Sequence, residues 1–415
     1  MTNLSRINLA LAYSLVFCGC SFESNLEINA LQKGIWRGEL EVQEKLLPFN
    51  FELLQGDEGA VEMILHNAEE RIVIDDLSII GDSLYVNMHI FDATLKAKIS
   101  GDKMIGRWTK NYLENHWVPF NATLGNAYRF SHELLIPKAN ISGKWEVRFI
   151  SPGGDTTLAM GILRQDDHVL EGTFLTISGD YRYMEGNVWG DRLALSTFDG
   201  ASAMLVNGSI VDTNTLKGEF YSGRSENATW IATRNEKATL PDPDEITSLK
   251  EGYDEINFTF PDLNGKMVSL DDAQYQGKVV IIQLFGTWCP NCMDETIFLN
   301  EWYKKNSDKN LEIIGLAYEK KDDYAYARKR VLKMIKELKP KYDYLIAGTA
   351  TVGEASKSLP MLDGVKSFPT LIFIDKNGKV RRIYTGFRGP GTGEYYQEFT
   401  KDFEAYVASL LKENS

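Results

Sequence analysis

An internal repeat in the first half of the chain constrains its fold more than any other feature of the sequence. The motif GIW at residues 34–36 recurs as GKW at 143–145, and GDSL at 81–84 recurs as GDRL at 190–193 with the same offset. Matches that keep a constant offset indicate two copies of one supersecondary unit rather than chance similarity.

Each copy is predicted to be an antiparallel β-meander. Apolar residues alternate with polar ones through Leu84, Val86, Met88 and Ile90, which is the period of half-buried strands. Gly-Asp, Asp-Gly and Asn-Gly pairs at short spacing mark the turns. The copies span 34–126 and 140–236, and the need to protect strand edges favours closure into a barrel, with sandwiches as the alternative.

After a linker rich in proline and acidic residues, 237–254, the pattern changes to strands alternating with helices over 255–415. Strands are expected at 278–285, 311–318, 342–347, 368–375 and 380–384, and helices at 289–305, 324–338 and 394–412. This order predicts an α/β sheet with helices on its faces. The fold class is therefore an all-β N-terminal region followed by an α/β domain.

Beyond residue 20 the sequence contains only two cysteines, Cys289 and Cys292. A disulfide across two intervening residues closes so small a loop that it removes little entropy from the unfolded chain. Stability is therefore a weak reason for the pair, and reactivity is the better one.

The pair lies in the motif FGTWCPNC, residues 285–292, where a buried strand ends and a helix begins. Free N–H groups and the positive end of the helix dipole stabilise a thiolate on Cys289. Pro290 suits the first helical turn, and Cys292 falls on the same helix face, close enough for a disulfide. We expect Cys289 to attack a substrate disulfide and Cys292 to resolve the mixed disulfide.

Other chemistries of a C-x-x-C pair are less well supported. A zinc site or a cysteine protease needs histidine, but the five histidines, at positions 66, 89, 116, 132 and 168, all lie in the repeat region. A peroxidase of the peroxiredoxin type would resemble Pro-x-x-x-Thr-x-x-Cys, and the residues after Thr287 do not place a cysteine correctly. Thiol peroxidase remains a minor alternative, and no metal or cofactor is expected besides the redox-active disulfide.

The strand, the motif GTWCPNC, the helix and a later SFPT at 367–370 resemble the TlpA/ResA-like thioredoxin family over residues 255–415. The resemblance implies a thioredoxin-like fold, thiol-disulfide oxidoreductase activity and a general antioxidant role. It also implies that Pro369 follows a cis peptide bond and packs opposite the disulfide, with Phe368 beside it; a trans proline at a strand start is the alternative.

Two more positions follow from the resemblance. Glu295 matches a carboxylate that moves protons near the active site, although a glutamate early in a helix also suits the dipole. Gln283 stands where thioredoxin has a buried aspartate, and because an amide cannot take up a proton, the proton route shifts to Glu295. Trp288 is expected to shield the disulfide, and the intervening Pro290 and Asn291 to tune its potential.

The first twenty residues predict export to the cell envelope. Arg6 precedes the apolar run 7–17, which is too short to span a membrane as a mature helix. The following Cys18-Gly19-Cys20 resembles a bacterial lipoprotein signal with lipid on Cys20, and a plain secretory signal is the alternative. A lipid there would anchor the protein to a membrane surface, facing the periplasm.

These features predict a thiol-disulfide oxidoreductase that acts on other envelope proteins and exchanges electrons with an upstream thiol protein. The surrounding module resembles reductants, which favours a reductase, whereas Pro290 directly after Cys289 resembles the dipeptide of some oxidants, so the direction of electron flow stays open. Maturation of apocytochromes is one task that the resemblance makes possible. The net charge of −13 disfavours a nucleic-acid partner. The competing hypothesis is an envelope lipoprotein in which the β repeats bind a ligand or protein and the thiols are secondary.

Overall fold

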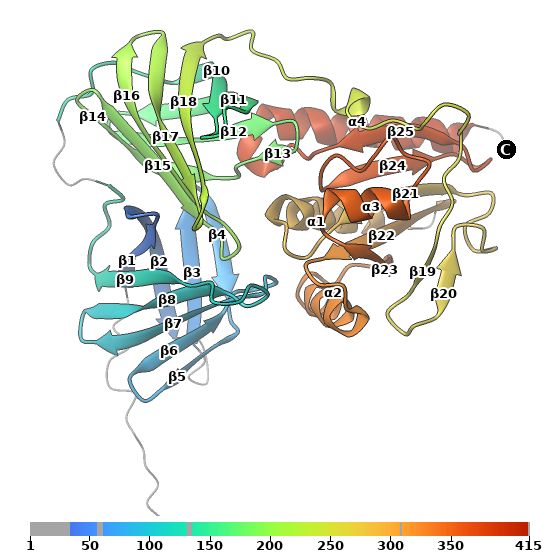
Figure 1. Cartoon of the computed structure of the whole chain (residues 1–415), viewed down its shortest axis with the longest axis horizontal. Helices are drawn as coiled ribbons and strands as arrows, with labels where there is room; N and C mark the ends of the chain where they lie inside the picture. The colour runs from blue at the N-terminus through green and yellow to red at the C-terminus, as the bar shows by residue number, and fades with distance from the viewer. Residues whose placement is uncertain (1–33, 56–60, 131–134, 308, 414–415) are drawn as a thin grey trace, which may run out of the picture. The chain divides into compact units, whose positions relative to one another are not determined.

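The computed structural model describes residues 34–55, 61–130, 135–307 and 309–413, and contains two large antiparallel sheets followed by a smaller mixed sheet (Figure 1). The predicted signal, including Cys20, lies outside these residues. No helix among them is long and apolar enough to cross a membrane. Below, the β-region denotes residues 34–236 and the α/β region denotes residues 255–413.

The first predicted copy forms one nine-stranded sheet in the order β4-β3-β2-β1-β9-β8-β7-β6-β5. Its strands are β1 (Gly34–Val42), β2 (Lys45–Gln55), β3 (Val61–Asn67), β4 (Glu70–Ile74), β5 (Leu77–Ile80), β6 (Ser83–Asn87), β7 (Ala93–Ser100), β8 (Lys103–Lys110) and β9 (Val118–Leu124). The first and last strands pair, whereas no ladder joins β4 to β5 within the described part of the copy. This sheet is curled but keeps two edges (Figure 1).

The second copy forms its own sheet and closes. Its strands are β10 (Gly143–Ile150), β11 (Thr156–Asp166), β12 (Val169–Thr176), β13 (Gly179–Asp180), β14 (Met184–Trp189), β15 (Arg192–Phe198), β16 (Ala203–Asp212), β17 (Thr215–Ser222) and β18 (Glu226–Arg234). Strand β10 pairs with both β11 and β18, and the additional β11–β12 ladder completes a ring. The two copies are thus two separate sheets, and β13 is attached to β12 outside the ring.

The repeat in the sequence corresponds to a repeated piece of backbone. Gly34 and Gly143 begin equivalent strands with φ of 132° and 122°, a conformation that favours glycine. Two residues later Trp36 and Trp145 are fully buried in their respective cores. The shared motif therefore specifies how each meander starts and which aromatic side chain its core contains.

The α/β region is built on a five-stranded sheet in the order β23-β22-β21-β24-β25. Its strands and helices are β21 (Val279–Phe285), α1 (Pro290–Lys304), β22 (Leu311–Glu319), α2 (Tyr324–Leu338), β23 (Asp343–Thr349), α3 (Val352–Ser358), β24 (Thr370–Ile374), β25 (Val380–Thr385) and α4 (Glu394–Lys412). The predicted elements are confirmed to within a few residues. Sequence reasoning missed α3 and the hairpin β19 (Thr259–Pro261)–β20 (Met267–Ser269).

Strand β21 lies in the centre of this sheet, and each of its seven residues is buried. It pairs in parallel with β22 and antiparallel with β24. Helix α1, which follows it, is held by aromatic contacts: the ring of Phe298 lies 5.0 Å from that of Phe403 on α4. Phe403 in turn lies 5.7 Å from Phe373 on β24. These contacts pack the middle of α1 against α4, and α4 against the sheet.

The predicted linker 237–254 packs along the α/β region. It contains a short 3-10 turn, η2 (Pro243–Glu245), whose Asp244 pairs with Arg382 on β25 at 2.7 Å. The Thr385 hydroxyl donates to the Thr247 hydroxyl at 2.8 Å, and both residues are buried. The linker therefore has defined partners, although its composition predicted none. Outside the linker, a second 3-10 turn, η3 (Pro390–Thr392), precedes α4.

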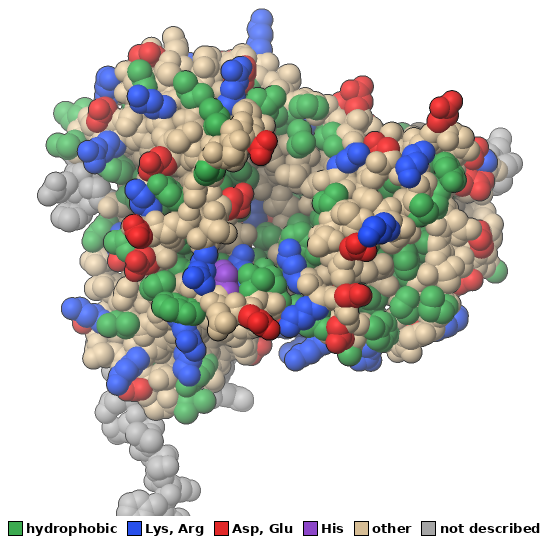
Figure 2. All heavy atoms as spheres, in the orientation of Figure 1, with side chains coloured by type: hydrophobic (Ala, Val, Ile, Leu, Met, Phe, Trp, Pro, Cys, Tyr) green, Lys and Arg blue, Asp and Glu red, His purple; other side chains and the backbone are tan. Residues whose placement is uncertain are grey.

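Surface charge contributes little to this architecture. Figure 2 shows basic side chains interspersed with acidic ones over the face that it draws. Exposed ion pairs among the described residues, such as Lys357–Glu354 at 2.6 Å, are of a kind that typically contributes no more than about 1 kcal/mol. The buried apolar cores of the three sheets supply the main stabilisation.

Replacing either repeated core tryptophan with alanine, Trp36→Ala or Trp145→Ala, is expected to destabilise the β-region by about 3–5 kcal/mol, because each change leaves a cavity. Urea unfolding followed by circular dichroism measures the loss. The matched control is Trp117→Ala, since Trp117 is 50% exposed, and it should change stability by about 0.5 kcal/mol or less. A cost of under about 1 kcal/mol for both core variants would contradict the assigned cores.

Candidate functional site

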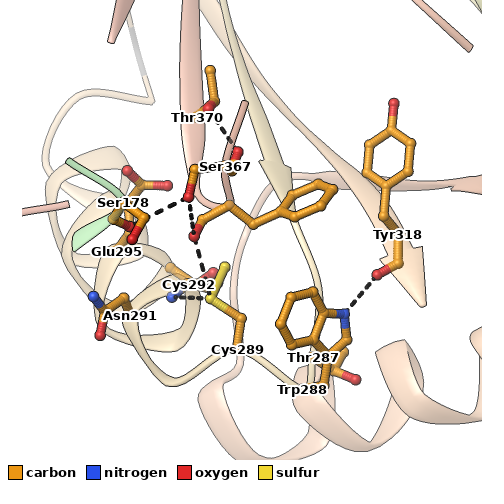
Figure 3. The surroundings of a disulfide bond; sticks show 12 residues. Ser178, Thr287, Trp288, Cys289, Asn291, Cys292, Glu295, Tyr318, Ser367 and Thr370 are labelled. Carbon is orange, nitrogen blue, oxygen red and sulfur yellow. Dashed lines mark hydrogen bonds between the residues drawn. A yellow bond between two sulfur atoms is a disulfide. The ribbon is translucent and has the colours of Figure 1, made fainter. Parts of the chain in front are cut away.

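The two cysteines form a disulfide at the start of α1, with their Cα atoms 5.2 Å apart (Figure 3). Cys289 is the N-cap of the helix, and its Sγ accepts a hydrogen bond from the Cys292 N–H at 3.2 Å. Pro290 occupies the first turn, as predicted. Cys289 is 6% exposed and Cys292 is fully buried, so Cys289 is the sulfur that an incoming thiol reaches first.

The loop before β24 faces the disulfide. The Phe368–Pro369 peptide bond is cis, which is the conformation that the family resemblance implies. The carbonyl oxygen of Phe368 lies 3.7 Å from the Sγ of Cys289. The ring of Phe368 meets that of Trp288 edge-on, with centroids 5.9 Å apart. Residues predicted from two distant segments therefore meet around Cys289.

Glu295 lies on α1 one turn beyond Cys292 and is fully buried. Gln283 on β21 donates from Nε2 to the Glu295 carboxylate at 2.9 Å and to the Cys292 carbonyl at 3.4 Å. The other carboxylate oxygen, Oε1, has no hydrogen-bond partner among the described residues. Burial raises the pKa of Glu295 to about 8, and the hydrogen bond from Gln283 offsets this only in part.

The amide of Gln283 is itself held from two sides. Its Oε1 accepts hydrogen bonds from the Thr296 hydroxyl at 3.2 Å and from the Tyr342 hydroxyl at 3.3 Å. These bonds orient the amide so that its nitrogen points to Glu295. Gln283 is therefore a positioning residue for the carboxylate, at the place where thioredoxin itself has a buried aspartate.

Sequence reasoning missed a second buried carboxylate near the site. Glu319, at the end of β22, accepts the N–H of Thr287 at 2.8 Å. Burial raises the pKa of Glu319 to about 7, against the lowering effect of that bond and of Arg330. The signal that could have found it is a polar residue at the carboxyl end of a strand parallel to β21, since such ends meet at one edge.

The residues on either side of Glu319 hold Trp288. The indole N–H of Trp288 donates to the Tyr318 carbonyl at 2.9 Å, and the Lys320 ammonium lies 3.5 Å from the indole ring centroid. Burial, together with the charge of Lys110, lowers the pKa of Lys320 to about 8. Trp288 is thus fixed beside the disulfide as an apolar wall with a cation on it.

The β-region also contributes to the surroundings of the disulfide. Asn291 donates from Nδ2 to the carbonyl of Asp180 at 3.0 Å. Arg182 pairs with Asp294 on α1 at 3.2 Å and with Glu70 on β4. Burial raises the pKa of Asp294 to about 7. These contacts join α1 to residues of the β-region more than a hundred positions earlier. The sequence pattern did not predict them.

The histidines of the described residues all belong to the β-region. Within the ranges that the structure describes, no group of three or more His, Cys, Asp or Glu side chains is placed to hold a metal ion. His132 and the predicted lipid site Cys20 lie outside those ranges.

Comparison with known proteins identifies the α/β region. The Redoxin family model matches residues 251–398. A thiol-disulfide oxidoreductase ResA of Bacillus thuringiensis is 33% identical over 153 residues, which cover 37% of this chain and 78% of that protein. A thiol:disulfide interchange protein DsbE of Pseudomonas aeruginosa is 29% identical over 145 residues, covering 35% of this chain and 72% of the relative.

Among solved structures, a thiol:disulfide interchange protein of the thioredoxin family from Chlorobium tepidum covers 40% of this chain and 99% of its own, at 22% identity and a TM-score of 0.30. The residues that the Redoxin model matches include Cys289, Cys292 and Pro369. From this sequence similarity we conclude that the chain belongs to the TlpA/ResA-like thioredoxin family and is a thiol-disulfide oxidoreductase.

Proposed function

We propose that this protein is a membrane-anchored reductase of disulfides in other proteins of the cell envelope. The observation that supports this most directly is the disulfide at the N-terminus of α1, in which Cys289 keeps 6% exposure and Cys292 is fully buried. Lipidation of Cys20 would supply the anchor, and an upstream thiol protein would return the electrons. The redox-active disulfide would serve in place of a separate cofactor.

In the proposed first step the Cys289 thiolate of the reduced enzyme attacks a substrate disulfide. One substrate sulfur forms a bond to Cys289 while the other leaves as a thiolate. The N–H of Cys292 and the start of α1 stabilise the attacking thiolate. Pro369 and Phe368 border the sulfur on one side and Trp288 borders Phe368, which limits the directions of approach.

In the second step Cys292 attacks Cys289, forms the intramolecular disulfide and releases the second substrate thiolate. The thiol proton of Cys292 must leave, and we assign its acceptance to the Glu295 carboxylate one helical turn away. With a pKa of about 8, Glu295 is close enough to neutrality to accept this proton and to return it when the enzyme is reduced again.

Single replacement of each cysteine tests this order of events. Cys292→Ser should accumulate mixed disulfides with protein partners, because the resolving sulfur is absent, whereas Cys289→Ser should trap none. Non-reducing electrophoresis of cells producing each full-length variant measures the adducts. If neither variant traps a protein and the wild type reduces no disulfide substrate, the reductase hypothesis is wrong. The competing hypothesis, a lipoprotein that binds a ligand or protein through its β repeats, then replaces it.

The Glu295→Gln variant tests the proton route. Because the ionised carboxylate accepts the proton, resolution of the mixed disulfide should accelerate as the pH rises towards about 8, and the variant should lose this inflection. Its resolution rate at pH 7 should fall roughly 10²-fold. Rapid acid quenching of mixed disulfides at each pH gives the rate.

The matched control for this experiment is Glu301→Gln, an exposed glutamate on the same helix. It should leave both the rate and the inflection unchanged. An unaltered pH profile in Glu295→Gln would show that the carboxylate does not carry the proton.

A further inference from the structure

A short turn of the second β-sheet lies against the redox site. It comprises residues Thr176–Asp180, between the end of β12 and the two-residue strand β13, and is called the gate segment below. The Ser178 carbonyl accepts a hydrogen bond from the Ser367 hydroxyl at 3.5 Å, two residues before Pro369 (Figure 3). The turn therefore reaches the loop that faces Cys289.

The gate segment touches two more elements that border the disulfide. The Asp180 carbonyl accepts from Asn291, which lies between the two cysteines. The Asp180 carboxylate accepts the N–H of Gly389, in the segment after β25, at 2.6 Å. One turn is thus joined by hydrogen bonds to the start of α1, to the cis-proline loop and to the segment before α4.

Hydrogen bonds within the gate segment stabilise the conformation of this turn. The hydroxyl of Thr176 donates to the Gly179 carbonyl at 2.9 Å and accepts the N–H of Ser178 at 3.2 Å. Gly179 has φ of 133°, and a Cβ built there would overlap the side-chain amide of Asn291. Glycine at this position therefore allows the backbone of the turn to approach the residue between the cysteines.

The disulfide beside these contacts is little exposed. Cys289, which must meet the substrate sulfur, is only 6% exposed. A protein thiol brings a backbone and neighbouring side chains to the disulfide, whereas a small dithiol brings little beyond its sulfur. The turn is held to the α/β region by single hydrogen bonds from Ser367, Asn291 and Gly389, and it lies outside the closed ring of strands. Its displacement would therefore break these bonds and leave the ring intact.

We propose that the gate segment determines which thiols reach Cys289: small thiols pass while it is closed, and protein partners react only after it swings away. This inference rests on the proposed thiol-disulfide exchange at Cys289. The β-region would thereby determine the selectivity of the α/β region. It would do so through the hydrogen bonds of Asp180 with Asn291 and of Ser178 with Ser367.

The test compares two reductants on the oxidised full-length protein: dithiothreitol and a reduced bacterial thioredoxin. Gly179→Ala should hold the gate open, and should raise the rate of disulfide opening by thioredoxin about fivefold or more while changing the rate with dithiothreitol by less than about twofold. Quenching with a thiol-alkylating reagent and separating the products by mass measures both rates.

The matched control is Gly154→Ala. Gly154 lies in a turn of the same sheet with φ of 91°, and a Cβ there meets nothing within 4 Å, so it adds similar backbone strain without a clash. It should alter neither rate. A second variant, Asp180→Asn, weakens the bonds to Gly389 and to the N–H of Arg182, and should act in the same direction as Gly179→Ala if the latter does not fold.

Equal changes with both reductants, or no change in either gate variant, would overturn the gate while leaving the redox function intact. A wild-type disulfide that neither reductant opens would overturn the proposed exchange at Cys289, and the gate with it.

Discussion

The start of α1 at the end of a fully buried strand is the constraint on which the rest of the structure depends. The first N–H groups of any helix lack partners within the helix, and here Cys289 Sγ accepts one of them. The strand β21 is buried along its whole length, and Phe298 of α1 packs against Phe403 of α4, so both elements that position the sulfur belong to the core. The central strand and the helix that follows it therefore position Cys289 Sγ at the helix N-terminus.

A second consequence of burial is the state of the nearby carboxyl group. The hydrogen bond that Glu295 receives comes from Gln283, a neutral amide, so desolvation dominates and the pKa rises to about 8. A cation in the same place would have held the pKa of that carboxyl low and made it useless as a proton acceptor near neutrality. The amide that departs from thioredoxin's own pattern is thus compatible with proton transfer through the next turn of the helix.

Much of the fold could be predicted because it is encoded locally. The boundaries of α2 and α4 follow from apolar periodicity, and the paired glycine and tryptophan positions of the repeat follow from a shared backbone requirement. Only the second sheet closes, and its closure depends on the β11–β12 ladder. The amino-acid composition of these strands does not predict that they pair. The contacts of Asp180 and Arg182 with α1 join residues over a hundred positions apart, and polar pairs at such separations leave no periodic signal. The lipid site at Cys20 stays a prediction.

The proposed function requires that Cys289 and Cys292 interconvert reversibly between a disulfide and two thiols. The most direct measurement equilibrates the full-length protein in a series of reduced and oxidised dithiothreitol buffers, quenches with an alkylating reagent and weighs the peptide that contains both cysteines. Reversible exchange between Cys289 and Cys292 should give one transition in which both sulfurs become alkylated together. A peptide that remains unmodified in every buffer, or that is modified at one cysteine alone, would contradict it.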